Sequence, residues 1–146
     1  IVDDQDALTL ADGVLVDLAQ QIRAGRPIDV TMGYVNVIWL GDANAMTLLA
    51  LEHTTCPARV LNLAGPELLA TRDIGAQLAR GMGQPVEFIG SERDEAFLSD
   101  GSLGYTCLGH PAVSSAQMLL WTADWVARGG PTLGKPTHFE THSGQF

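Results

Sequence analysis

Apolar side chains recur along this 146-residue chain at helical spacing in several separate stretches. Apolar residues three or four positions apart favour an amphipathic helix, because they fall on one face of it. Ser114 and Gln117 form a capping box ahead of the last such stretch. The pattern predicts long helices over residues 14–24, 42–53, 71–83 and 114–128, and a short one at about 100–108. The helix over 42–53 is so rich in apolar residues that we expect it to be buried on most sides.

Shorter stretches rich in β-branched and aromatic residues lie between the predicted helices and predict strands. We expect strands at 28–31, 35–40, 59–64 and 86–89. The stretch at 59–64, RVLNLA, is apolar on both faces, which is typical of a parallel strand that is covered on both sides of its sheet.

Helices that alternate with strands predict an α/β fold, built on a small, mostly parallel sheet that is covered by helices. The length is that of one domain, which we place over residues 13–130. Residues 1–12 form an acidic leader, and residues 131–146 a polar, Gly/Pro-rich tail that we expect to be extended.

The negative charge of the chain makes nucleic acid an unsuitable partner. The net charge is −9, from 17 acidic and 8 basic residues, which argues against nucleic-acid binding. No apolar stretch reaches the length of a membrane span, and we expect a cytoplasmic protein whose two cysteines, Cys56 and Cys107, are reduced. Only 17% of the residues are charged, which indicates that another domain, a second copy or a missing segment covers part of the surface.

Several longer stretches carry a resemblance to a known family. These are GVLVDLAQQIRAGRPIDV (13–30), GYVNVIWLGDANAMTLLALEH (33–53), ARVLNLAGPELLATRDIGAQLARGMGQPVEF (58–88) and FLSDGSLGYTCLGHPAVSSAQMLLWTADWVARGG (97–130). In this order they resemble the C-terminal, substrate-side portion of the NAD(P)-dependent epimerases/dehydratases, which are extended short-chain dehydrogenases/reductases. Residues 1–12 do not match that family.

The residues that would carry the chemistry of the family are absent from the chain. The nearest approach to a dinucleotide-binding turn, Gly81-Met-Gly83, closes a predicted helix instead of opening one. The family pairs a catalytic Tyr with a Lys four residues later, but Tyr34 has Ile38 and Tyr105 has Gly109 at that spacing. We therefore assign no catalytic, cofactor-binding or metal-binding residue, and expect NAD(P) only in a full-length relative. The resemblance implies a truncated, substrate-binding portion without activity of its own.

Four polar residues are candidates for contact with a substrate. They fall at the predicted strand ends, where ligands meet open α/β sheets. A helix-capping role for Asp42 and a turn role for Glu67 are equally good interpretations. The candidates are Asn36, Asp42, Asn62 and Glu67.

Two polar clusters have plainer interpretations than catalysis or metal binding. Acids at 92–100 flank Arg93 and are interpreted as a solvated loop rather than paired catalytic carboxylates. His138 and His142 stand around Glu140 in a Pro-containing tail, where a solvated tail is favoured over a metal site.

The predicted strands would be left with an unpaired edge and an apolar face if the rest of such an enzyme were absent. We therefore expect a homo-oligomer, or a partner that is the missing N-terminal cofactor-binding half. The alternatives are a stand-alone module that binds a small molecule or assembles into an oligomer, and an unrelated enzyme that uses its own acids or histidines.

Overall fold

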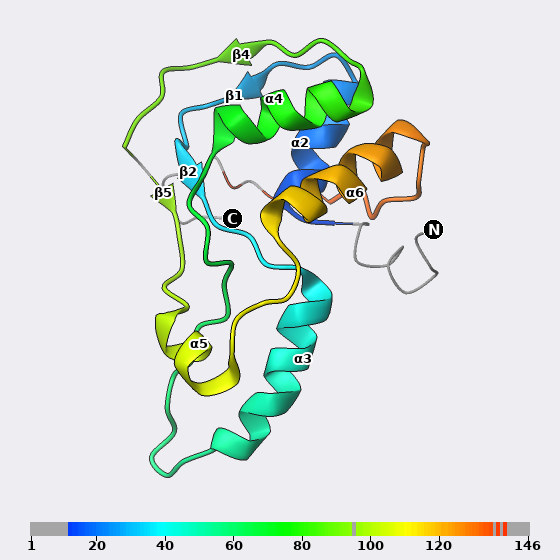
Figure 1. Cartoon of the computed structure of the whole chain (residues 1–146). Coiled ribbons are helices and arrows are strands. Elements are labelled where there is room, and N and C mark those ends of the chain that lie inside the picture. The colour runs from blue at the N-terminus through cyan, green and yellow to red at the C-terminus, as the bar shows by residue number, and fades with distance from the viewer. Residues whose placement is uncertain (1–11, 95, 136, 138, 140–146) are drawn as a thin grey trace.

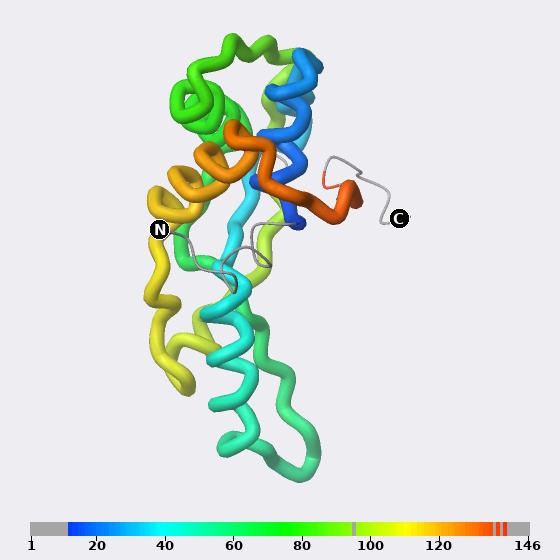
Figure 2. The backbone as a smooth tube through the Cα atoms, turned by 90° about the vertical axis from the view of Figure 1, so that its right-hand side faces the viewer, coloured from blue at the N-terminus to red at the C-terminus, as the bar shows by residue number. Residues whose placement is uncertain are grey.

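The computed structural model describes residues 12–94, 96–135, 137 and 139 of the chain. Helices and short strands form a compact upper part, and a narrower part extends away from it (Figure 1). The same division is clear after a quarter turn of the molecule (Figure 2). Within the described residues, no helix is both long and apolar enough to cross a membrane.

Three helices pack against one another in the upper part. They are α2 (Val14–Arg23), α4 (Thr71–Met82) and α6 (Ser115–Ala127), and they confirm three of the predicted helices. The Ser114 side chain accepts a hydrogen bond of 3.2 Å from the Gln117 N–H, which confirms the predicted cap of α6. Their inward faces supply most of the core, which includes Leu15, Leu18, Ile22, Ile74, Leu78, Met118, Leu119 and Val126.

The strands are each two residues long and form two small sheets. β1 (Ile28–Asp29) pairs in parallel with β4 (Phe88–Ile89). β2 (Tyr34–Val35) lies between β3 (Leu69–Ala70), which is antiparallel to it, and β5 (Ala96–Phe97), which is parallel. The predicted α/β fold with a small, mostly parallel sheet is confirmed. β3 and β5 were not predicted.

The predicted strand at 35–40 is wrong after Val35. The pairing of β2 ends at that residue, and α3 (Leu40–Ala50) begins where the strand was expected to finish. The side chain of Asn36 takes over the hydrogen bonding at this point, because it pairs with the backbone of Ser99 beyond the end of β5. Beyond Val35 no described strand pairs with this segment, so the ladder ends there.

The narrower part is built from α3, the 3-10 turn η1 (Leu51–His53) and the chain that returns beside them (Figures 1 and 2). We call residues 40–64 the arm. The helix predicted over 42–53 is present, but the expected burial is wrong, because Met46 is the only buried residue of α3. The helix is apolar on all sides, yet only one side meets the rest of the chain.

The strand predicted at 59–64 is also wrong in this structure. The returning segment of the arm is assigned to no helix or strand and pairs with no described strand. Val60 in this segment is 79% exposed. A strand needs a neighbouring backbone to pair with, and no described segment of the chain supplies one. The short predicted helix is confirmed as α5 (Ser102–Leu108), which contacts α3.

Candidate functional site

The side chain of Asn36 links its own segment to two other loops of the upper part. Its side-chain nitrogen donates to the Ser99 carbonyl at 2.8 Å and to the Gly65 carbonyl at 3.1 Å. Its side-chain oxygen accepts from the Ser99 N–H at 3.1 Å. Both donors and the acceptor of the amide are thus satisfied within the chain, so this side chain holds the backbone in place.

Asp42 lies in the first turn of α3, and the prediction that it caps the helix is wrong. The N-cap residue is Trp39, because the helix begins two residues earlier than its sequence pattern indicated. The Asp42 carboxylate instead accepts a hydrogen bond of 2.8 Å from the Val113 N–H. It therefore ties the start of the arm to the segment that enters α6.

Glu67 binds the N-terminus of α6. Its two carboxylate oxygens accept from the Ser115 N–H at 3.2 Å and from the Ser115 hydroxyl at 2.6 Å. A negative charge at this end of a helix is stabilised by the unpaired N–H groups and by the helix dipole. Glu67 thus fixes a helix whose inner face forms part of the core.

Replacement of Glu67 by alanine should lower the free energy of unfolding by about 2 kcal/mol, since it removes two hydrogen bonds to a charged acceptor. Urea denaturation followed by tryptophan fluorescence measures this. Glu67→Gln should lower the free energy of unfolding by a smaller amount, because the amide oxygen can still accept one hydrogen bond. Glu87→Ala is the control, since the Glu87 side chain is exposed and forms no hydrogen bond with the described part of the chain. A loss no larger than that of the control would contradict the anchoring role.

Asn62 is exposed on the returning segment of the arm, and its carbonyl lies against Gly104 of α5. The four predicted residues therefore lie along the connections between the upper part and the arm, and none of them lines the two pockets described below. Contact with a substrate stays a prediction for all four.

Tyr105 is a hydrogen-bond donor in the structure. Its hydroxyl donates to the Ala64 carbonyl at 2.8 Å, and its ring stacks on that of His110 at 4.7 Å. Partial burial, with a smaller effect from the charge of Asp100, raises the pKa of Tyr105. The pKa of Asp100 is lowered because its carboxylate accepts from Ser102. The tyrosine stays protonated at neutral pH and links α5 to the end of the arm.

A polar pocket of about 450 Å³ opens where α4 begins. Sequence analysis missed it, because it is assembled from three segments that lie far apart in the sequence. The only signal was the acidic cluster around Arg93, which was interpreted as a solvated loop. Its lining residues are Gly33, Tyr34, Ala70, Arg72, Asp73, Glu92, Arg93 and Asp94.

Arg72 is the cation with the best-defined geometry in this pocket. Its Nε donates to the Glu92 carboxylate at 2.5 Å, and its guanidinium lies 4.6 Å from the centre of the Phe88 ring. Both partners of the ion pair are about half exposed, so the pair itself contributes little to stability. The guanidinium thus lies over an aromatic ring with a carboxylate already bound to it.

The start of α4 adds to the attraction of the pocket for an anion. Its N-cap residue, Ala70, provides no side-chain cap, so the helix end relies on backbone groups. The Thr71 N–H and hydroxyl are both used, because they donate to the carbonyls of Gly33 and Met32. A guanidinium beside a helix N-terminus is an arrangement that suits phosphate or carboxylate.

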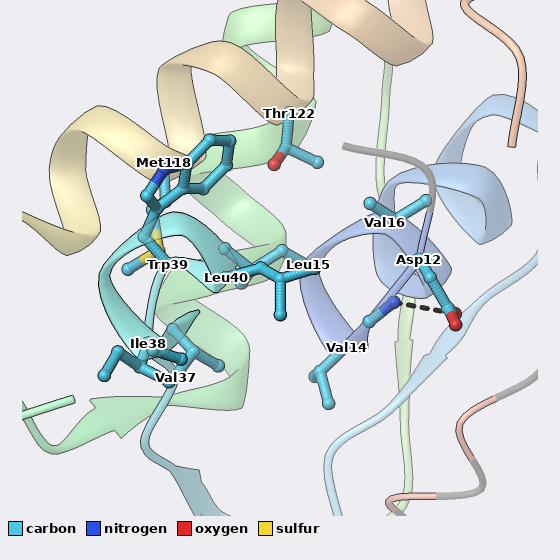
Figure 3. Close-up of a pocket in the computed structure, with 12 residues that line it drawn as sticks. Asp12, Val14, Leu15, Val16, Val37, Ile38, Trp39, Leu40, Met118 and Thr122 are labelled. Atoms are coloured by element: carbon cyan, nitrogen blue, oxygen red, sulfur yellow. Dashed lines mark hydrogen bonds between the residues drawn. The ribbon is translucent and has the colours of Figure 1, made fainter. Parts of the chain in front are cut away.

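A second, apolar pocket of about 350 Å³ lies at the base of the arm (Figure 3). It is bounded by the start of α2, by residues 37–40 and by α6. The side chains of Val14, Val37 and Leu40 form part of its wall, and Asp12 lies on the side of α2. No pair of groups suited to proton transfer lines it, so the pocket suits an apolar group.

The part of the chain that the structure describes contains no cluster of three His, Cys, Asp or Glu that could hold a metal ion. His138, Glu140 and His142 lie outside the described residues, so the metal interpretation of the tail is not tested. Residues 1–11 of the acidic leader also lie outside them.

Comparison with known proteins identifies the fold. No protein-family model matches the chain. No curated protein matches it either. Among solved structures, the UDP-glucuronic acid 4-epimerase of Bacillus cereus in complex with NAD is 21% identical with a TM-score of 0.63, and the match covers 80% of this chain and 38% of that one.

Two further structures give the same result. The Bordetella bronchiseptica enzyme WbmG, in complex with NAD and UDP, is 20% identical with a TM-score of 0.64, covering 85% of this chain and 41% of that one. The Thermus thermophilus UDP-glucose 4-epimerase in complex with NAD is 19% identical with a TM-score of 0.61. That match covers 79% of this chain and 40% of that one. The chain therefore has the fold of part of an epimerase and spans about two fifths of the length of these structures. The predicted likeness in fold to the epimerases is confirmed.

Proposed function

We propose that this chain is the substrate-binding portion of an NAD(P)-dependent epimerase/dehydratase-like protein, and that its polar pocket binds the diphosphate of a sugar nucleotide. The observation that carries the proposal is the stacked guanidinium of Arg72, which holds a carboxylate at the start of α4. The fold supports it, since the similar structures include enzymes with UDP or UDP-glucuronic acid bound.

A phosphate oxygen would take the place of the Glu92 carboxylate on Arg72. The exchange keeps a charge-assisted hydrogen bond on the guanidinium and releases Glu92 to solvent, where its charge is well hydrated. Arg93 lines the same pocket and adds a second positive charge to it. Asp73, Glu92 and Asp94 also line the pocket, so its three acids outnumber its two arginines, and we expect binding of modest strength.

We assign the hydride transfer of such a protein to a cofactor-binding part outside this chain. The sequence lacks both the glycine-rich dinucleotide turn and the Tyr-Lys pair. Bound NAD(P) would supply the hydride acceptor there. The residues of this chain would bind and orient the substrate, and we propose that the chain has no catalytic activity alone.

Binding of UDP tests the proposal directly. Calorimetric titration of the full chain should show UDP binding, and Arg72→Ala should weaken it roughly tenfold, as expected for loss of a charge-assisted bond. Glu92→Gln should strengthen it, because it removes the competing carboxylate. Arg128→Ala is the matched control, since Arg128 also pairs with a carboxylate at 2.5 Å, on the exposed side of α6. Absence of binding, or equal effects of Arg72→Ala and the control, would contradict the proposal.

A stand-alone module that binds an apolar small molecule is the second candidate, and the pocket of Figure 3 favours it. The affinity of an apolar ligand in that pocket should not change in Arg72→Ala. It would lose affinity when Val37 or Val14 on the wall is replaced by a polar residue.

A further inference from the structure

The hydroxyl of Thr122 is buried and has no partner among the described residues. Thr122 lies on the inner face of α6 and is 2% exposed. No hydrogen bond joins its hydroxyl to any described part of the chain. Two other helical threonines differ, because Thr47 and Thr106 donate to the carbonyls four residues earlier, at 2.7 and 3.0 Å. A buried hydroxyl without a hydrogen bond is unfavourable, so Thr122 needs a partner from outside the chain.

The Thr122 hydroxyl belongs to the wall of the apolar pocket at the base of the arm. In the view of Figure 3, its oxygen lies on the side of Thr122 that is turned toward Trp39. Of the twelve described residues that line the pocket, only Asp12, Trp39 and Thr122 carry a nitrogen or oxygen in the side chain. A cavity that is apolar except for a few polar groups is typical of a small-molecule site.

Trp39 forms an aromatic wall of this pocket. It is buried, and its ring centroid lies 5.1 Å from that of Trp121, with the two planes tilted by 57°. Gly41 leaves room for the ring, because a Cβ at that position would lie 2.7 Å from the indole nitrogen of Trp39. Aromatic rings attract one another in tilted and offset arrangements. The wall therefore suits a further flat ring.

The charge on the pocket wall is negative. It belongs to Asp12, whose carboxylate accepts a hydrogen bond of 2.8 Å from the Gly13 N–H (Figure 3). The described lining residues include no Lys, Arg or His. A bound carboxylate or phosphate would lose hydration and meet no cation in return. The pocket therefore favours an uncharged ligand, in contrast to the polar pocket at the start of α4.

We propose that this pocket binds a small, uncharged ring compound with one hydroxyl group, and that Thr122 forms a hydrogen bond with that group. The proposal rests on the second candidate function, because it names the class of ligand for the same pocket. The size is sufficient, since an apolar cavity of about 150 Å³ accepts benzene and this one measures about 350 Å³. The ring packs against Trp39, and the hydroxyl satisfies Thr122.

Two probes that differ by one hydroxyl test the proposal. Toluene and p-cresol share a ring and a methyl group, and ligand-observed NMR measures the affinity of the full chain for each. In Thr122→Val the affinity for p-cresol relative to toluene should fall roughly tenfold, the effect of one buried hydrogen bond. Taking this ratio removes the difference in hydration between the probes. Thr122→Ser keeps the hydroxyl and should keep the ratio, and Thr106→Val is the control that should leave both affinities unchanged.

The charge of the ligand is tested with p-toluate, which carries a carboxylate on the same ring. It should bind at least tenfold more weakly than p-cresol, and Asp12→Asn should reduce that difference. Binding of p-toluate as tight as that of p-cresol would overturn the uncharged class.

The melting temperature of the free chain gives a readout that needs no ligand. Because the hydroxyl is buried without a partner, Thr122→Val should raise the melting temperature by roughly 2 to 4 °C. Thr106→Val removes a hydroxyl that is already bonded and should not raise it. A lower melting temperature in Thr122→Val would show that the hydroxyl has a partner in the free chain and would overturn the proposal.

The binding results separate this proposal from the function on which it rests. An unchanged ratio of affinities in Thr122→Val, or binding of toluene without p-cresol, would overturn the role of Thr122 and keep the apolar pocket. Binding of neither probe would overturn both. UDP binding at the polar pocket should be the same with and without p-cresol, because the two pockets share no lining residue.

Discussion

Replacement of Gly65 by alanine should lower the free energy of unfolding by about 3 kcal/mol, the upper end of the usual cost of overpacking. A Cβ at this position would lie 1.8 Å from the carbonyl oxygen of Val37 and 2.7 Å from its carbonyl carbon. The obstacle is backbone, so no side-chain rotation can relieve the contact. The Gly65 segment and the β2–α3 connection would have to separate, and the hydrogen bond from Asn36 to the Gly65 carbonyl would lengthen.

Gly25→Ala is the control for this substitution. Gly25 has a φ of +65° and nothing within 4 Å of its would-be Cβ, so alanine there should cost only about 1 kcal/mol of conformational strain. Urea denaturation of both variants compares the two effects. A Gly65→Ala variant as stable as Gly25→Ala would mean that the two connections can separate without cost, and that the arm is only loosely attached.

The contact at Gly65 shows what the sequence could not reveal. The sequence marks Gly65-Pro66 as a turn, but the reason for the glycine is a backbone 28 residues earlier in the chain. α2, α4, α6 and the Ser114 cap were predictable, because each depends on residues within a few positions of one another. β3 and β5 were not, because their pairing joins distant segments and two residues leave almost no periodic pattern.

The candidate site shows the same limit. Glu67 and Asn36 were chosen as polar residues at strand ends, and both are polar residues whose partners lie far away in sequence. Each partner is a backbone or hydroxyl group of the chain itself, which sequence spacing cannot distinguish from a ligand. Arg72 was overlooked, because in the sequence it is simply a charged residue in the first turn of an amphipathic helix. Its interest arises only from Phe88 and Glu92, which the fold brings beside it.

Truncation of two leucines in different helices should change the free energy of unfolding by very different amounts. Leu78→Ala should lower the free energy of unfolding by about 3 to 4 kcal/mol, because Leu78 is fully buried on the α4 face within the core. Leu48→Ala should change it by less than about 0.5 kcal/mol, because Leu48 is 68% exposed on α3. Thermal and urea denaturation of the full chain measure both.

The comparison of the two variants also tests whether α3 is exposed in the free chain. By sequence alone, Leu48 lies in the more apolar helix, so Leu48→Ala would be expected to lower the free energy of unfolding more than Leu78→Ala does. A loss at Leu48 as large as that at Leu78 would show that α3 is already buried in the free chain, through self-association or a different fold of the arm. If the free chain tolerates Leu48→Ala, the exposed leucines of α3 contribute nothing measurable to its folding.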